Sequence, residues 1–560
     1  MAFLVRLRQA QTPMIGERRE LAPRGVLARL WDAPDLLVIV VWGAVIFCAA
    51  AFRVNFIGDG VRHLTPILTE SRPALGEPRW LLFPAFLFAT IKPLQIAGLV
   101  NSAKDAARVF LALDFFAGVA YLLLIRQWLL SKDVSPCSRA GALLVAGMTV
   151  PLLRYSCDIV EVMVPATIAL AGLVYLASQP PENVRNGLRV TAAAIAFASL
   201  LYQGIILAVA LVPCATARGA CVRARTIILF CVILAVTPLV MLTTMIASGS
   251  SPRTAIHRAL TGEENVLYRN SMALHRRTLR ERSIAAISLG VARRVIEIPD
   301  DLGLSGSLRL LSHRATFLEG ASYIGGCLLA LAMVVAGAVV IVRRRDWRIA
   351  IALAGILILP VIRSYAYLKF YALMPVVVAL VAAVSPPAIA FAAGAIVGSF
   401  NLTYLARDIA GDRQLAHDIA PLYENAGASA CWLTSGWGPP IFGWPGSECS
   451  MNHVLTGGHT EQVDAMIVEN NREMVESFRR CFCESSAVYT DDITVSSQEA
   501  VTEFARYYKF AGVDLNELLW SPRRGTLAFD KDGIVIFTYA RPVQLEICAG
   551  LKAASANASR

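Results

Sequence analysis

Long apolar runs recur along this chain, and several reach the ~20 residues that a helix needs to cross the hydrocarbon core of a bilayer. Hydrophobic residues make up 56% of the 560 positions and charged residues only 17%, which is more apolar surface than one water-soluble core could enclose. We therefore predict an α-helical polytopic membrane protein with about 11 transmembrane helices. The predicted spans are 36–52, 107–125, 140–154, 161–178, 188–201, 203–216, 226–247, 318–342, 348–362, 371–384 and 387–402.

Basic residues between the runs predict how the chain is oriented. The segment 1–35 is rich in arginine and precedes the first run, so the positive-inside rule places it in the cytoplasm, with the first run as an uncleaved anchor. The net charge of +11 is then a record of membrane orientation and not of a nucleic-acid partner. The basic connections share the cytoplasmic side if 81–99 does not cross the membrane; they are 126–139, 185–189, 218–225 and 343–348.

The segment 81–99 is predicted to lie along the outer membrane surface as a juxtamembrane helix, because it contains two prolines together with Lys92 and Gln95. This orientation leaves external loops at about 54–106 and 248–316. It also places the C-terminal segment 403–560 outside, so we expect a multi-pass protein of a bacterial inner membrane with a periplasmic C-terminal domain.

After the transmembrane domain, 36–402, the composition becomes polar and mixed, which predicts a soluble α/β domain over 403–560. Its five cysteines would lie in an oxidising compartment, so we expect at least one disulfide. Cys481 and Cys483 are too close in sequence to bridge each other, and no zinc-ligand pattern is present, so no structural metal is predicted there. The expected strands are 428–434, 487–490 and 533–539, and the expected helices are 461–482 and 497–510.

An acidic residue follows the first anchor in the sequence Phe-Ile-Gly-Asp59-Gly-Val-Arg-His63. Charged groups at the edge of a span are costly and tend to mark function, so Asp59 is the first catalytic candidate. The alternative is a plain turn, because aspartate between glycines suits turns. His63 lies beside it and is a candidate for substrate binding.

A second acidic site, Arg154-Tyr-Ser-Cys-Asp158-Ile-Val-Glu161, joins the third and fourth predicted spans on the same membrane face. We predict a catalytic role for Asp158 and Glu161 and a substrate-binding role for Arg154. The alternative for Asp158 is capping of the helix that follows it.

Cations and aromatic residues alternate at the outer end of the ninth predicted span, where Arg363, Tyr365 and Lys369 are candidates for substrate binding. The alternative is an interfacial belt with snorkelling side chains. The loop 253–314 is strongly basic and has the spacing of an amphipathic helix resting on anionic lipid headgroups, or of a solvated basic face. Acids that deprotonate a hydroxyl, with cations that hold a leaving phosphate, indicate sugar transfer from a lipid phosphate.

These residues resemble, in order and topology, the GT-C superfamily of polyprenyl-phosphate-dependent glycosyltransferases, which includes the protein O-mannosyltransferases and the lipid A aminoarabinose transferases. The resemblance covers roughly the first 400 residues. Asp59 is similar to the acid of the family's first external loop, and Arg154 with Asp158 to its second-loop element. Glu77-Pro-Arg79-Trp-Leu-Leu-Phe-Pro84 resembles the start of the juxtamembrane helix, and Tyr371-Ala-Leu-Met-Pro375 a late family segment.

The resemblance implies that Asp59 is the general base of an inverting displacement and that Asp158 and Glu161 position the acceptor, or a divalent cation (Mg²⁺ or Mn²⁺) in relatives that use one. Glu77 is a further substrate-binding candidate, and Arg79, Arg363 and Lys369 are candidates for the carrier phosphate. The implied partners are a polyprenyl-phosphate-linked sugar donor, a glycan, lipid or protein acceptor, and membrane lipids, without nucleic acid.

Two other classes remain open. An O-antigen ligase or polymerase would centre on arginine and histidine in a large external loop, where His257, His275 and His313 lie. A transporter or flippase of lipid-linked sugars would carry internal repeats and charges near the middle of spans. No convincing repeat is visible, and Asp114 is the exception to the rule that charges lie at span ends.

Overall fold

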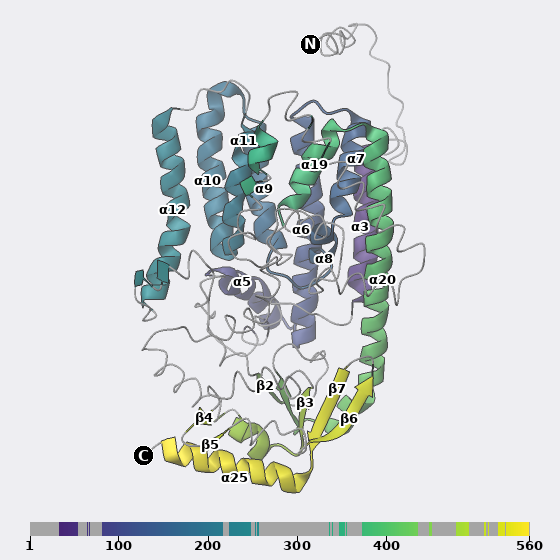
Figure 1. The fold of residues 1–560 in the computed structure, drawn as a ribbon, viewed down its shortest axis with the longest axis vertical. Coiled ribbons are helices and arrows are strands. Elements are labelled where there is room, and N and C mark those ends of the chain that lie inside the picture. The colour runs from purple at the N-terminus through teal and green to yellow at the C-terminus, as the bar shows by residue number, and fades with distance from the viewer. Residues whose placement is uncertain are drawn as a thin grey trace.

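The structure is a computed structural model, and it describes the parts of the chain that position the candidate site. They include most of the helical bundle, the long helix that leaves it and a C-terminal sheet (Figure 1). The described residues are 33–53, 64, 67, 81–216, 223–247, 252–253, 255–256, 335, 339, 347–352, 354–355, 372–434, 447–450, 476, 478–491, 509–510, 513–514, 525–531 and 534–558.

The described part is mostly helical, and five of its helices are long and apolar enough to cross a membrane. Their apolar faces pack into one continuous core, while large apolar side chains on the outer faces stay exposed, as expected for helices bathed in lipid. The chain is therefore a multi-pass membrane protein. The five helices are α3 (Pro34–Phe52), α6 (Ala103–Leu130), α10 (Val184–Leu201), α12 (Ala224–Ala247) and α20 (Pro387–Ala426).

Shorter apolar helices complete the described bundle, and two predicted spans differ from continuous α-helix. The span 140–154 breaks at Met148 and Thr149, because the proline at the start of the next helix does not continue the helix before it. The span 203–216 is mostly a 3-10 helix. The predicted spans 318–342 and 348–362 lie largely outside the described residues. These elements are α7 (Pro136–Gly147), α8 (Val150–Tyr155), α9 (Met163–Ala177), η1 (Pro181–Asn183), η2 (Gln203–Leu211), α11 (Val212–Ala215) and α19 (Met374–Val384).

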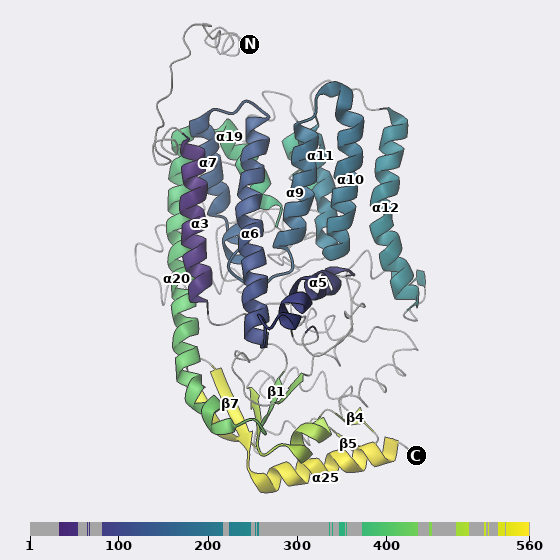
Figure 2. The same cartoon turned by 180° about the vertical axis from the view of Figure 1, so that it is seen from behind.

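Helix α5 (Phe83–Ile96) lies across the end of the bundle and not along it, as Figures 1 and 2 show. Its buried side chains, Phe83, Leu87 and Ile91, recur every four residues and so form one face. The backbone N–H of Leu82 donates to the carbonyl of Leu200 at 3.0 Å, which ties the start of α5 to the end of α10. A helix that does not run along the bundle is thus present within 81–99, as predicted, while its place at the outer membrane surface stays a prediction.

Buried polar contacts from α3 and α20 satisfy the carbonyl groups at the break between α7 and α8. The Trp42 indole donates to the carbonyl of Gly147 at 2.7 Å, and the Asn401 amide donates to that of Met148 at 2.7 Å. A side chain at Gly147 would meet the Trp42 ring at 2.9 Å, so this close approach requires glycine. At the opposite end of α3, Asp35 accepts hydrogen bonds from Arg126 at 2.9 Å and Arg139 at 2.8 Å.

Helix α20 continues without interruption from the bundle to a C-terminal sheet, so the predicted domain boundary at 402–403 falls inside a helix. The last turns of α20 pack on the sheet through Ile419, Tyr423 and Ala426. The sheet has the order β2-β1-β3-β7-β6, with parallel pairing of β1 to β2 and β3 and antiparallel pairing of β7 to β3 and β6. Its strands are β1 (Cys431–Thr434), β2 (Ser447–Ser450), β3 (Val488–Asp491), β6 (Gly525–Lys531) and β7 (Ile534–Tyr539).

The three predicted strands correspond to β1, β3 and β7, whereas β2, β6 and the final helix α25 (Arg541–Ala558) were not predicted. The end of the predicted helix 497–510 is wrong, because Lys509 and Phe510 form β4 and pair with β5 (Val513–Asp514). The rest of that segment lies outside the described residues.

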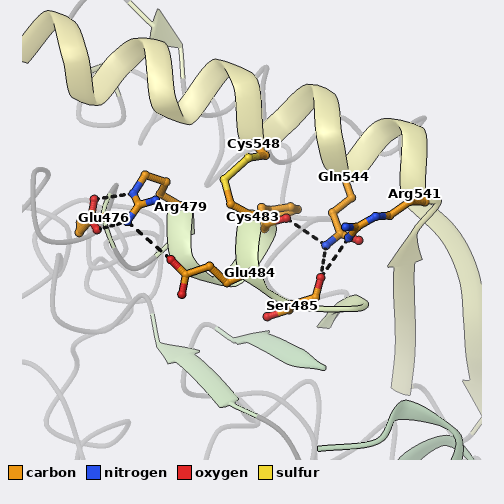
Figure 3. Close-up of a disulfide and its surroundings, with 9 residues drawn as sticks. Glu476, Arg479, Cys483, Glu484, Ser485, Arg541, Gln544 and Cys548 are labelled. Atoms are coloured by element: carbon orange, nitrogen blue, oxygen red, sulfur yellow. Dashed lines mark hydrogen bonds and ion pairs between the residues drawn. A yellow bond between two sulfur atoms is a disulfide. The ribbon is translucent and has the colours of Figure 1, made fainter. Parts of the chain in front are cut away.

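Two disulfides hold the C-terminal elements together, Cys431–Cys481 and Cys483–Cys548, so the prediction of at least one is confirmed. The second joins α25 to the helical segment 478–484, which contains Cys483 (Figure 3). Beside it, the Gln544 amide donates to the carbonyls of Phe482 at 3.0 Å and Ser485 at 2.8 Å. The disulfide and these hydrogen bonds together anchor α25.

Removal of the second disulfide should loosen α25. We expect the pair Cys483→Ser and Cys548→Ser to lower the unfolding free energy of this region by about 2–5 kcal/mol, because the open chain gains conformational freedom. Limited proteolysis with mass spectrometry should then show faster cleavage at α25. Cys137→Ser, which changes an exposed free cysteine, is the matched control. Equal cleavage in all three proteins would contradict the expectation.

Candidate functional site

Three of the predicted site residues lie in the described structure: Arg154 in the last turn of α8, and Asp158 and Glu161 in the connection between α8 and α9. The others lie outside the described residues, as do His257, His275 and His313 of the predicted external loop. Those other predicted residues are Asp59, His63, Glu77, Arg79, Arg363, Tyr365 and Lys369.

Residues 156–162 connect α8 to α9 and are called the acidic connection, because they contain two buried carboxylates. Asp158 is 1% exposed and Glu161 is fully buried. One oxygen of Asp158, Oδ1, accepts a hydrogen bond from the backbone N–H of Ile159 at 2.9 Å. The N-cap of α9 is Val162, and no side chain accepts a capping hydrogen bond from the first turn of that helix, so the alternative in which Asp158 caps it is wrong.

The other oxygen of Asp158, Oδ2, faces two guanidinium groups. It lies 3.2 Å from Nη2 of Arg53 and 3.7 Å from Nε of Arg154. Since both oxygens of Asp158 already have donors, this carboxylate is better suited to hold its surroundings in place than to accept a proton from a substrate.

Arg53 is the centre of a larger ionic cluster that the sequence did not predict. It directly follows α3, and its side chain is 2% exposed. Its Nη1 lies 2.7 Å from Asp408 Oδ2 and 3.2 Å from Asp412 Oδ2, on successive turns of α20. Arg53 therefore joins the end of α3, the connection between α8 and α9, and α20.

Burial alone would disfavour the charged form of Arg53, but the nearby carboxylates of Asp158, Asp408 and Asp412 outweigh it and raise the pKa of Arg53 above its ordinary value. The guanidinium is therefore charged at any physiological pH. A signal in the sequence was the single arginine directly after an apolar helix, together with two acids spaced four residues apart. The acids lie beyond the predicted domain boundary and were assigned to the soluble domain.

Asp114 of α6 belongs to the same region. It is fully buried, and its Oδ2 accepts a hydrogen bond from the backbone N–H of Val160 at 3.3 Å. Its Oδ1 has no hydrogen-bond partner among the residues that the structure describes. The exceptional charge within a predicted span thus lies against the connection between α8 and α9.

Arg154 differs from Arg53 in accessibility, because its side chain remains 23% exposed. A partly exposed guanidinium beside buried carboxylates can donate hydrogen bonds to the oxygens of a phosphate group. Within the described part of the chain, no group of three or more histidine, cysteine, aspartate or glutamate side chains is arranged to hold a metal ion.

Two solved structures are similar to this chain. The crystal structure of ArnT from Cupriavidus metallidurans in the apo state aligns over 92% of this chain and 99% of its own, at 14% identity and a TM-score of 0.41. The crystal structure of that protein bound to undecaprenyl phosphate aligns over 91% and 98%, with the same identity and TM-score. No protein-family model and no curated protein matches the sequence. Similarity at this level assigns no activity.

The acidic connection contains an internal reporter, Cys157, which is buried and donates to the carbonyl of Leu153 at 3.1 Å. Burial raises the pKa of its thiol to about 12. We therefore expect N-ethylmaleimide at pH 7 to modify exposed Cys137 and to leave Cys157 unmodified until the protein is denatured, because the thiolate is the reactive form. Peptide mass spectrometry measures both. Equal modification of the two in the folded protein would contradict the described packing.

Proposed function

We propose that this chain is an integral membrane glycosyltransferase that takes a sugar from a polyprenyl-phosphate donor at the outer face of a bacterial inner membrane. The observation that carries the proposal is the buried acidic connection, Asp158 to Glu161, beside the partly exposed cation Arg154. The first external loop, which bears Asp59, leaves the bundle from Arg53, the residue in contact with Asp158.

The proposed reaction is a direct displacement with inversion. Asp59 takes the proton of an acceptor hydroxyl, whose oxygen forms a bond to the anomeric carbon of the sugar. The bond between that carbon and the phosphate oxygen breaks, and its electron pair stays with the polyprenyl phosphate. Arg154, Arg79, Arg363 and Lys369 are the candidates that hold the phosphate as its charge develops.

The remaining acids have supporting roles in this proposal. Glu161 and Asp158 shape the acceptor side, with Asp158 as the fixed member because two arginines hold it. His63, Glu77 and Tyr365 are the remaining candidates for substrate contact. A divalent cation, Mg²⁺ or Mn²⁺, stays part of the proposal; activity that is lost with a chelator and restored by either ion would support it.

Sugar transfer by membranes that contain the protein tests the proposed function. A panel of radiolabelled polyprenyl-phosphate sugars should yield labelled acceptor with the wild type. We expect Asp59→Asn to lower the rate by about 100- to 10,000-fold, because the amide cannot accept the proton. Glu182→Gln, at an exposed position between α9 and α10, is the matched control with the same chemical change.

Each outcome of this assay has a definite meaning. Label transferred by the wild type and the control but not by Asp59→Asn supports both the reaction and the base. Equal transfer by all three removes Asp59 from the mechanism. No transfer from any donor contradicts the proposed function.

Membrane orientation provides a separate test. We expect alkaline phosphatase fused after residue 558 to be active, because that enzyme folds only where disulfides form, and a fusion after Gln179 to be inactive. Matched expression of the two fusions is verified by immunoblot. Activity of the second fusion in place of the first would invert the proposed orientation.

A further inference from the structure

Arg53 brings together parts of the chain that are far apart in sequence. It is separated from Asp158 by 105 positions and from Asp408 and Asp412 by 355 and 359. Figures 1 and 2 show α3 and α20 side by side along the bundle, with the end of α3 beside the middle of α20. The guanidinium group therefore closes a junction of three separate elements.

The shape of a guanidinium is what allows these simultaneous contacts. One terminal nitrogen, Nη2, is directed at Asp158, and the other, Nη1, at the two acids of α20. A lysine ammonium is a single point charge on a flexible stem and cannot place donors on both sides in a fixed plane. The arrangement therefore specifies arginine.

Because the ion pairs of Arg53 are largely buried, loss of the guanidinium would leave carboxylates without a partner. Asp158 is 1% exposed and Asp412 12%, so neither carboxylate can replace the lost cation with bulk water. The backbone N–H of Ile159 holds one oxygen of Asp158, and Arg53 holds the other. Two directional contacts on one carboxylate fix both its place and its rotation.

We propose that Arg53 is a positioning residue that fixes the Asp158 carboxylate in the active site and ties it to Asp408 and Asp412 of α20. The inference rests on the proposed function and deepens it, because it makes α20 a support of the site. A second contact between the same helices, Arg413 over the ring of Phe52 at 5.4 Å, holds α20 against α3 one residue away. The far end of α20 packs on the C-terminal sheet, so the sheet is connected to Asp158 through one continuous helix.

Three variants of the junction test this proposal. Arg53→Met removes the charge, Arg53→Lys keeps it without the planar donors, and the pair Asp408→Asn with Asp412→Asn removes the contribution of α20. For sugar transfer, we expect Arg53→Met to lower kcat about 100-fold with KM nearly unchanged, because a displacement of about 1 Å can cost that much. Arg53→Lys should recover part of this loss, and the α20 pair should lower kcat about tenfold.

Two matched controls separate positioning from general stability. Asp35→Asn disrupts a buried cluster of the same kind at the other end of α3, where one carboxylate faces two arginines. Gln414→Ala changes an exposed residue of α20 near the junction. We expect Asp35→Asn to lower Tm at nearly normal kcat, and Gln414→Ala to change neither. Normal kcat in folded Arg53→Met, or an equal loss of kcat in Asp35→Asn, would overturn the proposal.

A measurement without substrate keeps the inference distinct from the proposed function. Cys157 adjoins Asp158, so N-ethylmaleimide should modify it in Arg53→Met or, if that variant does not fold, in the α20 pair. It should stay protected in the wild type and in Asp35→Asn. Continued protection in the folded junction variants would overturn the proposal. If the wild type transfers no sugar from any donor, the proposed function fails, and this labelling alone decides whether Arg53 holds the connection.

Discussion

A single buried arginine surrounded by carboxylates is the contact on which the α5 end of this bundle depends. Removal of one partner from a buried ion pair typically costs about 3–5 kcal/mol, because the remaining charge is left uncompensated away from water. Around Arg53, removal of the cation would leave Asp158, Asp408 and Asp412 facing one another. The end of α3, the connection between α8 and α9, and the middle of α20 are therefore held together by charge as well as by packing.

The break between α7 and α8 determines where the charged residues of this region lie. The chain leaves α7 at Gly147, where Trp42 and Asn401 bind the freed carbonyl groups, and resumes as α8. This interruption brings Arg154 and the acidic connection to the end of the bundle. Helix α5 lies across that same end, and α20 passes it on the way to the sheet (Figures 1 and 2). The irregular segments thus bring charged side chains together at one end of the bundle, which is where the proposed function requires them.

The sequence predicted what periodicity and charge encode locally. Apolar runs located the helices, the two prolines of 81–99 located α5, and β-rich segments located three strands. The Arg53 cluster was not predictable, because Arg53 is 105 or more positions from each of the three acids and no local pattern pairs an arginine with distant acids. The unbroken course of α20 was also missed, because a helix can continue through a change from apolar to polar composition. The sequence predicts a catalytic role for Asp158, whereas the structure shows both of its oxygens held by donors. One of these donors, Arg53, is distant in sequence, so no local pattern could reveal it.

The position of a bound polyprenyl phosphate tests the central claim most directly. An experimental structure of the protein in a lipid nanodisc with that ligand would locate the phosphorus atom relative to the acidic connection. The account predicts the phosphate oxygens within about 4 Å of the Arg154 guanidinium, on the face that carries Asp158, with Arg53 still between Asp158 and α20. A phosphate bound at the opposite end of the bundle, near Asp35, would contradict it.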